Sequence, residues 1–290
     1  MKIFPTLATF LLALNLYAQD TKIRLVSLEQ EPLAFAKVYF LSQDHFTSTD
    51  ENGYFSVNQK LFEKEEHIRI SGFGLNDTTF SLSSLRANKT IVLKVKEMEL
   101  PQFTLSEKAL KSLTLGDTAS PVEDRKRLMK TVDEGTFIDS KYVTWVKLPK
   151  RRKKILTKLH FYVSDMDGFV EEEITLRIIG QRKGDSFKPS RLYSTEGLND
   201  FAPGPIKIKV SKTGWNVVEF KEEVLLDENI EEVFLVFDLL RPSEVFALAY
   251  QNDRKKILQM GLYVPESAQI ARFDKNAQYF AVSIEMLVER

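Results

Sequence analysis

Short runs in which every second side chain is apolar recur along most of this chain. The longest closes the sequence, where the alternate positions from 280 to 288 are Phe, Val, Ile, Met and Val. Successive side chains of a β-strand point to opposite faces, so this spacing predicts strands that bury one face. Because turn residues separate the runs at short intervals, the sequence predicts an all-β protein built from β-sandwiches.

The predicted strands form two groups, and a stretch with a weaker pattern separates them. The first group covers residues 23–28, 36–40, 54–57, 68–70, 80–82 and 91–95. The second covers residues 142–148, 155–163, 174–179, 206–211, 215–220, 233–239, 256–263 and 280–288. We therefore predict one domain over residues 19–95, a linker over 96–121 and a second domain over 122–290. Residues 122–132, within the second domain, are predicted as a marginal helix or a loop.

A polar turn leads into one strand of the first domain. Asp50 and Asn52 have short side chains that can accept hydrogen bonds from nearby backbone N–H groups. Gly53 can adopt a positive φ without the steric cost that a Cβ atom brings. The run from Tyr54 to Val57 then predicts a strand, so Asp50, Asn52 and Gly53 are expected to form a structural turn.

The residues of this turn carry a resemblance to a known family. The stretch 49–55, Thr-Asp-Glu-Asn-Gly-Tyr-Phe, resembles the "TDxxGxF" turn of carboxypeptidase regulatory-like domains. Residues 31–38 match the family's "x-Pro-Leu-x-x-Ala-x-Val", residues 68–74 match a strand ending in "S-x-x-G-Y", and residues 91–93 match its closing strand. The sequence departs from the family in two places: the usual Gly before the first strand is absent, and the aromatic residue expected after the late Gly is replaced, with Phe73 preceding Gly74. The resemblance covers roughly residues 22–95 and implies a transthyretin-like β-sandwich without catalytic residues.

The second group of strands resembles the C-terminal β-sandwich that accompanies such domains in exported bacterial proteins. Five short sequence patterns of that sandwich have counterparts in this chain, at residues 158–163, 176–179, 204–205, 214–220 and 234–240. Eight predicted strands are the number found in a jelly roll. This less specific resemblance implies a jelly-roll-like β-sandwich.

The beginning of the chain is typical of a secretory signal peptide. Lys2 is followed by an apolar stretch too short to span a bilayer, and Ala18 offers a small residue for cleavage. We predict a signal peptide over 1–18, a mature chain that begins near Gln19 and no transmembrane segment after its removal. The chain contains no Cys, so neither disulfides nor a lipidated Cys is expected. The predicted location is the periplasm, the outer-membrane surface or the medium.

Composition and spacing argue against several kinds of chemistry. The 41 basic residues balance the 41 acidic residues, so nucleic acid is not an expected partner. His45, His67 and His160 are scattered without the spacing of metal ligands. No nucleophile elbow, phosphate-binding loop or zinc-protease motif is found. We therefore predict no catalytic residues, no metal and no cofactor.

Two classes of function remain open at this point. The favoured one is a non-catalytic envelope protein that binds a protein or a glycan, and the alternative is an enzyme, or an accessory subunit of one, that acts on glycan or peptide. Aromatic residues of the second domain are the candidates for a binding surface: Phe187 and Tyr193 in a predicted loop over 186–205, together with Trp145 and Trp215. The basic run 150–154 is either a solvated loop or a contact for an anion or a membrane surface.

Overall fold

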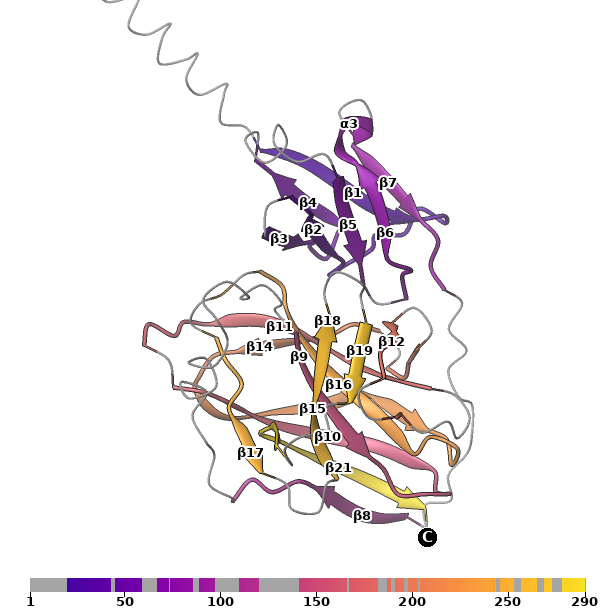
Figure 1. The fold of residues 1–290 in the computed structure, drawn as a ribbon, viewed down its shortest axis with the longest axis vertical. Helices are drawn as coiled ribbons and strands as arrows, with labels where there is room; N and C mark the ends of the chain where they lie inside the picture. The colour runs from indigo at the N-terminus through magenta and orange to yellow at the C-terminus, as the bar shows by residue number, and fades with distance from the viewer. Residues whose placement is uncertain are drawn as a thin grey trace, which may run out of the picture. The chain divides into compact units, whose positions relative to one another are not determined.

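The computed structural model of the chain divides into two compact units, residues 1–96 and 97–290, which are described one at a time (Figure 1). The structure describes residues 20–42, 45–58, 67–72, 74–85, 89–96, 110–119, 141–165, 167–181, 187–188, 191–195, 198–202, 204–241, 243, 246–252, 257–264, 269–272 and 278–289. The predicted signal peptide, the predicted helix over 122–132 and Phe73 lie outside these residues.

The first unit consists of two small sheets that share one core. In one sheet, β1 (Thr21–Ser27) lies between β4 (Tyr54–Val57), which is antiparallel to it, and β7 (Thr90–Leu93), which is parallel. The other sheet has the order β3 (His45–Ser48), β2 (Lys37–Phe40), β5 (His67–Ser71) and β6 (Thr78–Ser81). Alternate residues of both sheets are buried together, as their spacing predicts. Leu82, predicted to lie in a strand, instead begins the short helix α3 (Leu82–Leu85).

The polar turn before β4 has the predicted geometry at Asp50 and Gly53. The Asp50 carboxylate oxygen Oδ1 accepts hydrogen bonds from the N–H groups of Asn52 and Tyr54, both at 2.9 Å. Gly53 has a φ of 77°, and a Cβ atom there would lie 2.5 Å from the carbonyl oxygen of Leu25. Asn52 takes part through its main chain. Glycine at 53 is therefore required both by the backbone conformation and by the neighbouring strand.

The second unit contains a four-stranded and an eight-stranded sheet. The four-stranded sheet has the order β15 (Gly214–Leu226), β10 (Lys154–Val163), β21 (Val282–Glu289) and β8 (Leu110–Leu115). The larger sheet comprises β12 (Tyr193–Ser194), β19 (Gln269–Arg272), β18 (Leu258–Val264), β9 (Lys141–Lys147), β16 (Glu232–Leu239), β11 (Glu172–Gly180) and β13 (Asn199–Asp200), while β14 (Ile206–Val210) also pairs with β11. In addition, β17 (Tyr250–Asn252) pairs with β20 (Gln278–Phe280).

The two larger sheets of this unit pack face to face. Phe161 on β10 and Phe237 on β16 are both fully buried, and their ring centroids lie 5.5 Å apart. Contact between inward-facing side chains of two sheets is the arrangement of a β-sandwich. The prediction of an all-β protein with β-sandwich packing is confirmed, and each of the eight strands predicted in this unit is present.

The predicted linker over 96–121 is wrong for residues 110–115. These residues form β8, which pairs with β21 along its length (Figure 1). Leu113 lies opposite Met286 and Leu115 opposite Ile284, so both leucines face the sandwich core. The strand contributes core residues to the second unit, which therefore includes residues well before 122. Among the described residues, no helix is long and apolar enough to span a lipid bilayer.

Candidate functional site

Three of the four aromatic residues predicted to form a binding surface lie in the interior of the second unit. The exposed fractions of Trp145, Phe187 and Tyr193 are 2%, 1% and 9%. The Phe187 ring packs edge-on against the Tyr193 ring, with ring centroids 4.9 Å apart. The centroids of the Phe187 and Phe234 rings lie 4.5 Å apart. Side chains buried in this way cannot stack on a ligand from solvent, so the prediction of a binding surface is wrong for these three residues.

Hydrogen bonds explain why the aromatic part of the predicted loop turns inward. The N–H group of Phe187 donates to Glu232 Oε2 at 2.7 Å, and the N–H group of Lys188 donates to the Tyr193 hydroxyl at 2.8 Å. The backbone around Phe187 is thereby tied to β16, and both rings join the core cluster around Phe234. The aromatic composition of this segment therefore serves packing.

Trp215, the fourth candidate, is half-buried on the outer face of the four-stranded sheet. It lies opposite Tyr162 on β10, and the two rings meet edge to face with centroids 5.4 Å apart. Val217, two residues further along β15, is 53% exposed. This face also holds the ion pair Lys158–Glu219 at 2.7 Å and a hydrogen bond between His160 Nε2 and Glu285 Oε1 at 2.8 Å. Trp215 thus remains accessible, but it stands on a different sheet from Trp145 and Tyr193.

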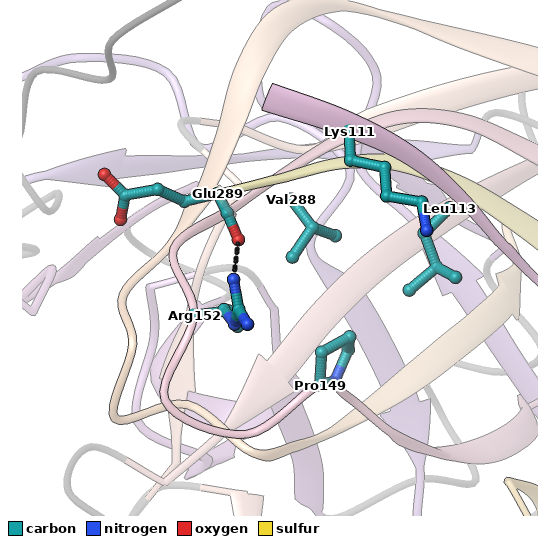
Figure 2. Close-up of a pocket in the computed structure, with 6 residues that line it drawn as sticks. All are labelled: Lys111, Leu113, Pro149, Arg152, Val288 and Glu289. Carbon is teal, nitrogen blue, oxygen red and sulfur yellow. Dashed lines mark hydrogen bonds between the residues drawn. The ribbon is translucent and has the colours of Figure 1, made fainter. Parts of the chain in front are cut away.

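A pocket of about 540 Å³ lies where β8 and β21 meet the loop between β9 and β10 (Figure 2). Its volume is in the range typical of sites for small molecules, roughly 300–1,000 Å³. Six residues line it: Lys111 and Leu113 from β8, Val288 and Glu289 from β21, and Pro149 and Arg152 from the loop. The pocket therefore draws its walls from three separate segments of the chain.

Three charged residues line this pocket, and each is positioned in a different way. Lys111 lies opposite Val288 in the β8–β21 ladder and shares its face with Leu113, so its long side chain starts from a core-facing position. Arg152 Nη1 donates a hydrogen bond to the main-chain oxygen of Glu289 at 2.8 Å. Figure 2 shows the Glu289 carboxylate directed away from the other five residues. The resulting lining combines an apolar floor with two positive charges.

The basic run 150–154 is divided among several environments. Lys150 forms an ion pair with Glu231 at 2.9 Å, and Arg151 is exposed with a φ of 51°. Arg152 lines the pocket, and Lys154 is fully buried at the start of β10. The run is therefore not a uniform solvated loop, and only Arg152 among its residues belongs to the pocket.

Lys154 is the largest fully buried side chain of the structure's described residues. Its ammonium group donates to the carbonyl oxygens of Asp227, at 3.2 Å, and Ile230, in the turn between β15 and β16. Burial lowers the pKa of Lys154 from 10.5 to about 8, and the nearby carboxylates of Glu231, Asp227 and Glu228 offset only part of this effect. The amine joins the turn to β10 and is not accessible to a substrate.

Metal chemistry finds no support in the described ranges, where no three His, Asp or Glu side chains cluster in a way that could hold an ion. His160 is engaged by Glu285, and the His45 ring packs beside Phe40 with centroids 5.5 Å apart. His67 is exposed on β5.

Comparison of the chain with models of protein families, and with curated proteins, finds no match. The resemblance to carboxypeptidase regulatory-like domains therefore stays a hypothesis that rests on the residues quoted for it.

Sequence reasoning identified the strand that holds Val288 and the basic run that holds Arg152, but not the pocket. Leu113 and Lys111 were missed because β8 was assigned to a linker. One signal was present in the sequence: Lys111 alternates in phase with Leu113 and Leu115, so a short strand with all three residues on one face could have been expected. Pairing with β21 was not predictable from that signal.

Proposed function

We propose that this protein is an exported, non-catalytic binding protein of the bacterial cell envelope, and that its second unit holds the ligand site. The observation that carries the proposal is the pocket of about 540 Å³ between β8, β21 and the β9–β10 loop. A rigid sheet that supports a pocket with apolar walls and a few polar groups is the usual design of a binding site. An envelope protein or a glycan is the partner expected from the sequence.

The first unit fits this proposal as a spacer. Its two sheets and its Asp50–Gly53 turn agree with the transthyretin-like β-sandwich that the resemblance implies. The jelly-roll-like assignment of the second unit is proposed on the same grounds, with β-sandwich packing as its support. Export is inferred from the apolar stretch that follows Lys2.

The binding proposal is tested by blocking the pocket. Leu113→Trp replaces a half-buried leucine of the lining with a larger side chain that strands accommodate well. Val217→Trp is the matched control, because Val217 is an exposed strand residue outside the pocket. The assay is a ligand-observed NMR screen of chemically diverse small molecules. We expect some of these molecules to bind both the wild-type chain and the control variant but not Leu113→Trp.

Two outcomes would contradict the proposal. One is the absence of any binder of the wild-type chain, and the other is a set of binders that Leu113→Trp retains in full while its thermal unfolding is unchanged. Turnover of a bound glycan or peptide by the purified protein would favour the enzyme alternative instead. Export is checked separately by the mass of protein recovered from the envelope, which should correspond to a chain that begins near Gln19.

A further inference from the structure

The pocket carries a local excess of positive charge in a chain whose total charge is balanced. Lys111 and Arg152 both line it, whereas the sequence as a whole has 41 basic and 41 acidic residues. Among the described residues, neither cation forms an ion pair with a carboxylate. By contrast, Lys150 and Lys158 each have a carboxylate oxygen within 3 Å. The two pocket cations are therefore available to an anion from outside.

Arg152 already forms a hydrogen bond to the main chain before any ligand arrives. Its Nη1 group donates to the Glu289 carbonyl oxygen at 2.8 Å, and the N–H group of Glu289 donates to the carbonyl oxygen of Lys153 at 3.1 Å. These two bonds tie the loop to the end of β21. A guanidinium group has five N–H donors, so one bond to a carbonyl leaves donors for a second acceptor. The bond to the carbonyl limits the positions of the exposed guanidinium group, which reduces the side-chain entropy lost when it binds an anion.

Lys111 on its own has a simpler explanation. Lys111 is exposed at the start of β8, and a lysine on a strand at the edge of a sheet discourages pairing with another chain; β8 is the last described strand of its sheet. That explanation does not account for Arg152, which reaches the same pocket from a distant segment. Convergence of two cations on one pocket is better explained by recognition of an anion.

The rest of the lining defines the remainder of the ligand. Leu113, Val288 and Pro149 are apolar, Val288 is only 8% exposed, and the Glu289 carboxylate points away from them (Figure 2). Apolar walls stabilise a ligand through the apolar surface that it buries. We infer that the pocket binds a carboxylate group carried on an apolar body, such as the C-terminus of a peptide with an apolar last residue or a free alkyl carboxylic acid. This inference rests on the proposed function, because it names the ligand class of the same pocket.

The test compares acids with their neutral amides. Isothermal titration calorimetry would measure two pairs on the full chain: N-acetyl-Val-Leu with a free carboxylate against its C-terminal amide, and hexanoate against hexanamide. We expect at least one acid to bind about tenfold more tightly than its amide, since a charge-assisted hydrogen bond contributes roughly twice as much as a neutral one. Its affinity should also fall as the salt concentration rises. The pair that shows the preference distinguishes a peptide C-terminus from a free acid.

Variants then assign the preference to the two cations. Lys111→Met and Arg152→Met keep side chains of similar length without the charge, and Lys150→Met is the control in the same loop because Lys150 does not line the pocket. We expect each single pocket variant to weaken the affinity for the acid about three- to tenfold, and the double variant to weaken it more strongly. The affinity of these variants for the amide, and both affinities of Lys150→Met, should equal the wild-type values.

The inference is overturned if neither acid binds more tightly than its amide, or if the double variant keeps the full preference. Those results would leave the proposed function intact as long as neutral molecules still bind the wild-type chain and are excluded by Leu113→Trp. If nothing binds the wild-type chain in the wider screen, the proposed function fails as well.

Discussion

Replacing Lys154 with Met tests how a buried amine affects the stability of the second unit. The Lys154 side chain is fully buried, and its amine donates to the carbonyl oxygens of Asp227 and Ile230. Below pH 8 the fold must keep a positive charge away from water, which lowers the pKa of the group from 10.5 to about 8. A neutral amine still has two N–H donors, one for each carbonyl. Deprotonation therefore removes the cost of burial without removing either hydrogen bond.

The sign of the pH dependence follows from the two pKa values. Because the folded value lies below the unfolded value, the unfolded chain binds more protons between pH 8 and pH 10.5, and Lys154 makes the free energy of unfolding increase with pH in this window. Where the unfolded chain binds one more proton than the folded chain, the free energy of unfolding increases by about 1.36 kcal/mol per pH unit. This condition holds from about pH 8 upward, so the increase from pH 7 to pH 9.5 amounts to about 2 kcal/mol. In Lys154→Met this contribution is absent.

At pH 7 two opposing effects determine the stability of the variant. Met removes the buried charge, but it also leaves two carbonyl oxygens without their donor, at a cost of about 1–3 kcal/mol each. At pH 7 we therefore expect the free energy of unfolding of Lys154→Met to equal that of the wild type or to lie slightly below it. At pH 9.5 the variant should fall behind the wild type by about 2 kcal/mol more than at pH 7. The informative quantity is the change of this difference with pH.

The assay is urea unfolding followed by tryptophan fluorescence. Both tryptophans of the chain, Trp145 and Trp215, belong to the second unit, so the signal reports on that unit alone. Lys209→Met is the control, because the Lys209 side chain is 62% exposed and forms only a surface ion pair with Glu171. Other groups that titrate near pH 9.5 affect all three proteins equally. If the difference between wild type and Lys154→Met is the same at both pH values, or shrinks at pH 9.5, the reasoning about the buried amine is refuted.

Two further predictions concern residues whose roles the structure fixes. Gly53→Ala should destabilise the first unit by at least about 2 kcal/mol because of its positive φ and the close approach to the Leu25 carbonyl, whereas Asp50→Ala should cost about 0.5–2 kcal/mol. Hydrogen exchange of the amides of β1 and β4 in the full chain would measure both losses, and equal, negligible losses would contradict the geometry of the turn. Phe187→Ala should cost the second unit about 3–5 kcal/mol in tryptophan-monitored unfolding, and a loss below about 1 kcal/mol would be incompatible with its place in the core.

Alternation in the sequence was sufficient to predict the long strands. β10 and β21 each bury every second side chain over most of their length, because one face of each packs against the other sheet. Short strands gave no such signal. β12 and β13 contain two residues each, and a pair of residues has no periodicity. Their positions depend on partners far along the chain, such as Ile270 opposite Tyr193, which the sequence does not indicate.

The inward packing of Phe187 and Tyr193 could not be predicted for a related reason. A segment rich in aromatic, Gly and Pro residues is typical of a binding loop, but the same residues can fill a core. Which of the two occurs depends on whether a buried partner lies within reach, here Phe234 on β16, and on the Glu232 carboxylate that accepts the Phe187 N–H. Contacts between distant segments decide the outcome, and local composition does not.

The pocket follows from constraints that serve folding first. The register of β8 is fixed by Leu113 and Leu115, since a shift by one residue would move both leucines to the outer face and bring Ser112 and Thr114 toward the core. This register places Lys111 beside Val288. Core packing and the hydrogen bond from the Arg152 side chain to the Glu289 carbonyl thus influence where the two cations of the pocket lie, independently of any ligand. The pocket is accordingly preformed, and the removal of either charge is expected to change ligand affinity far more than stability.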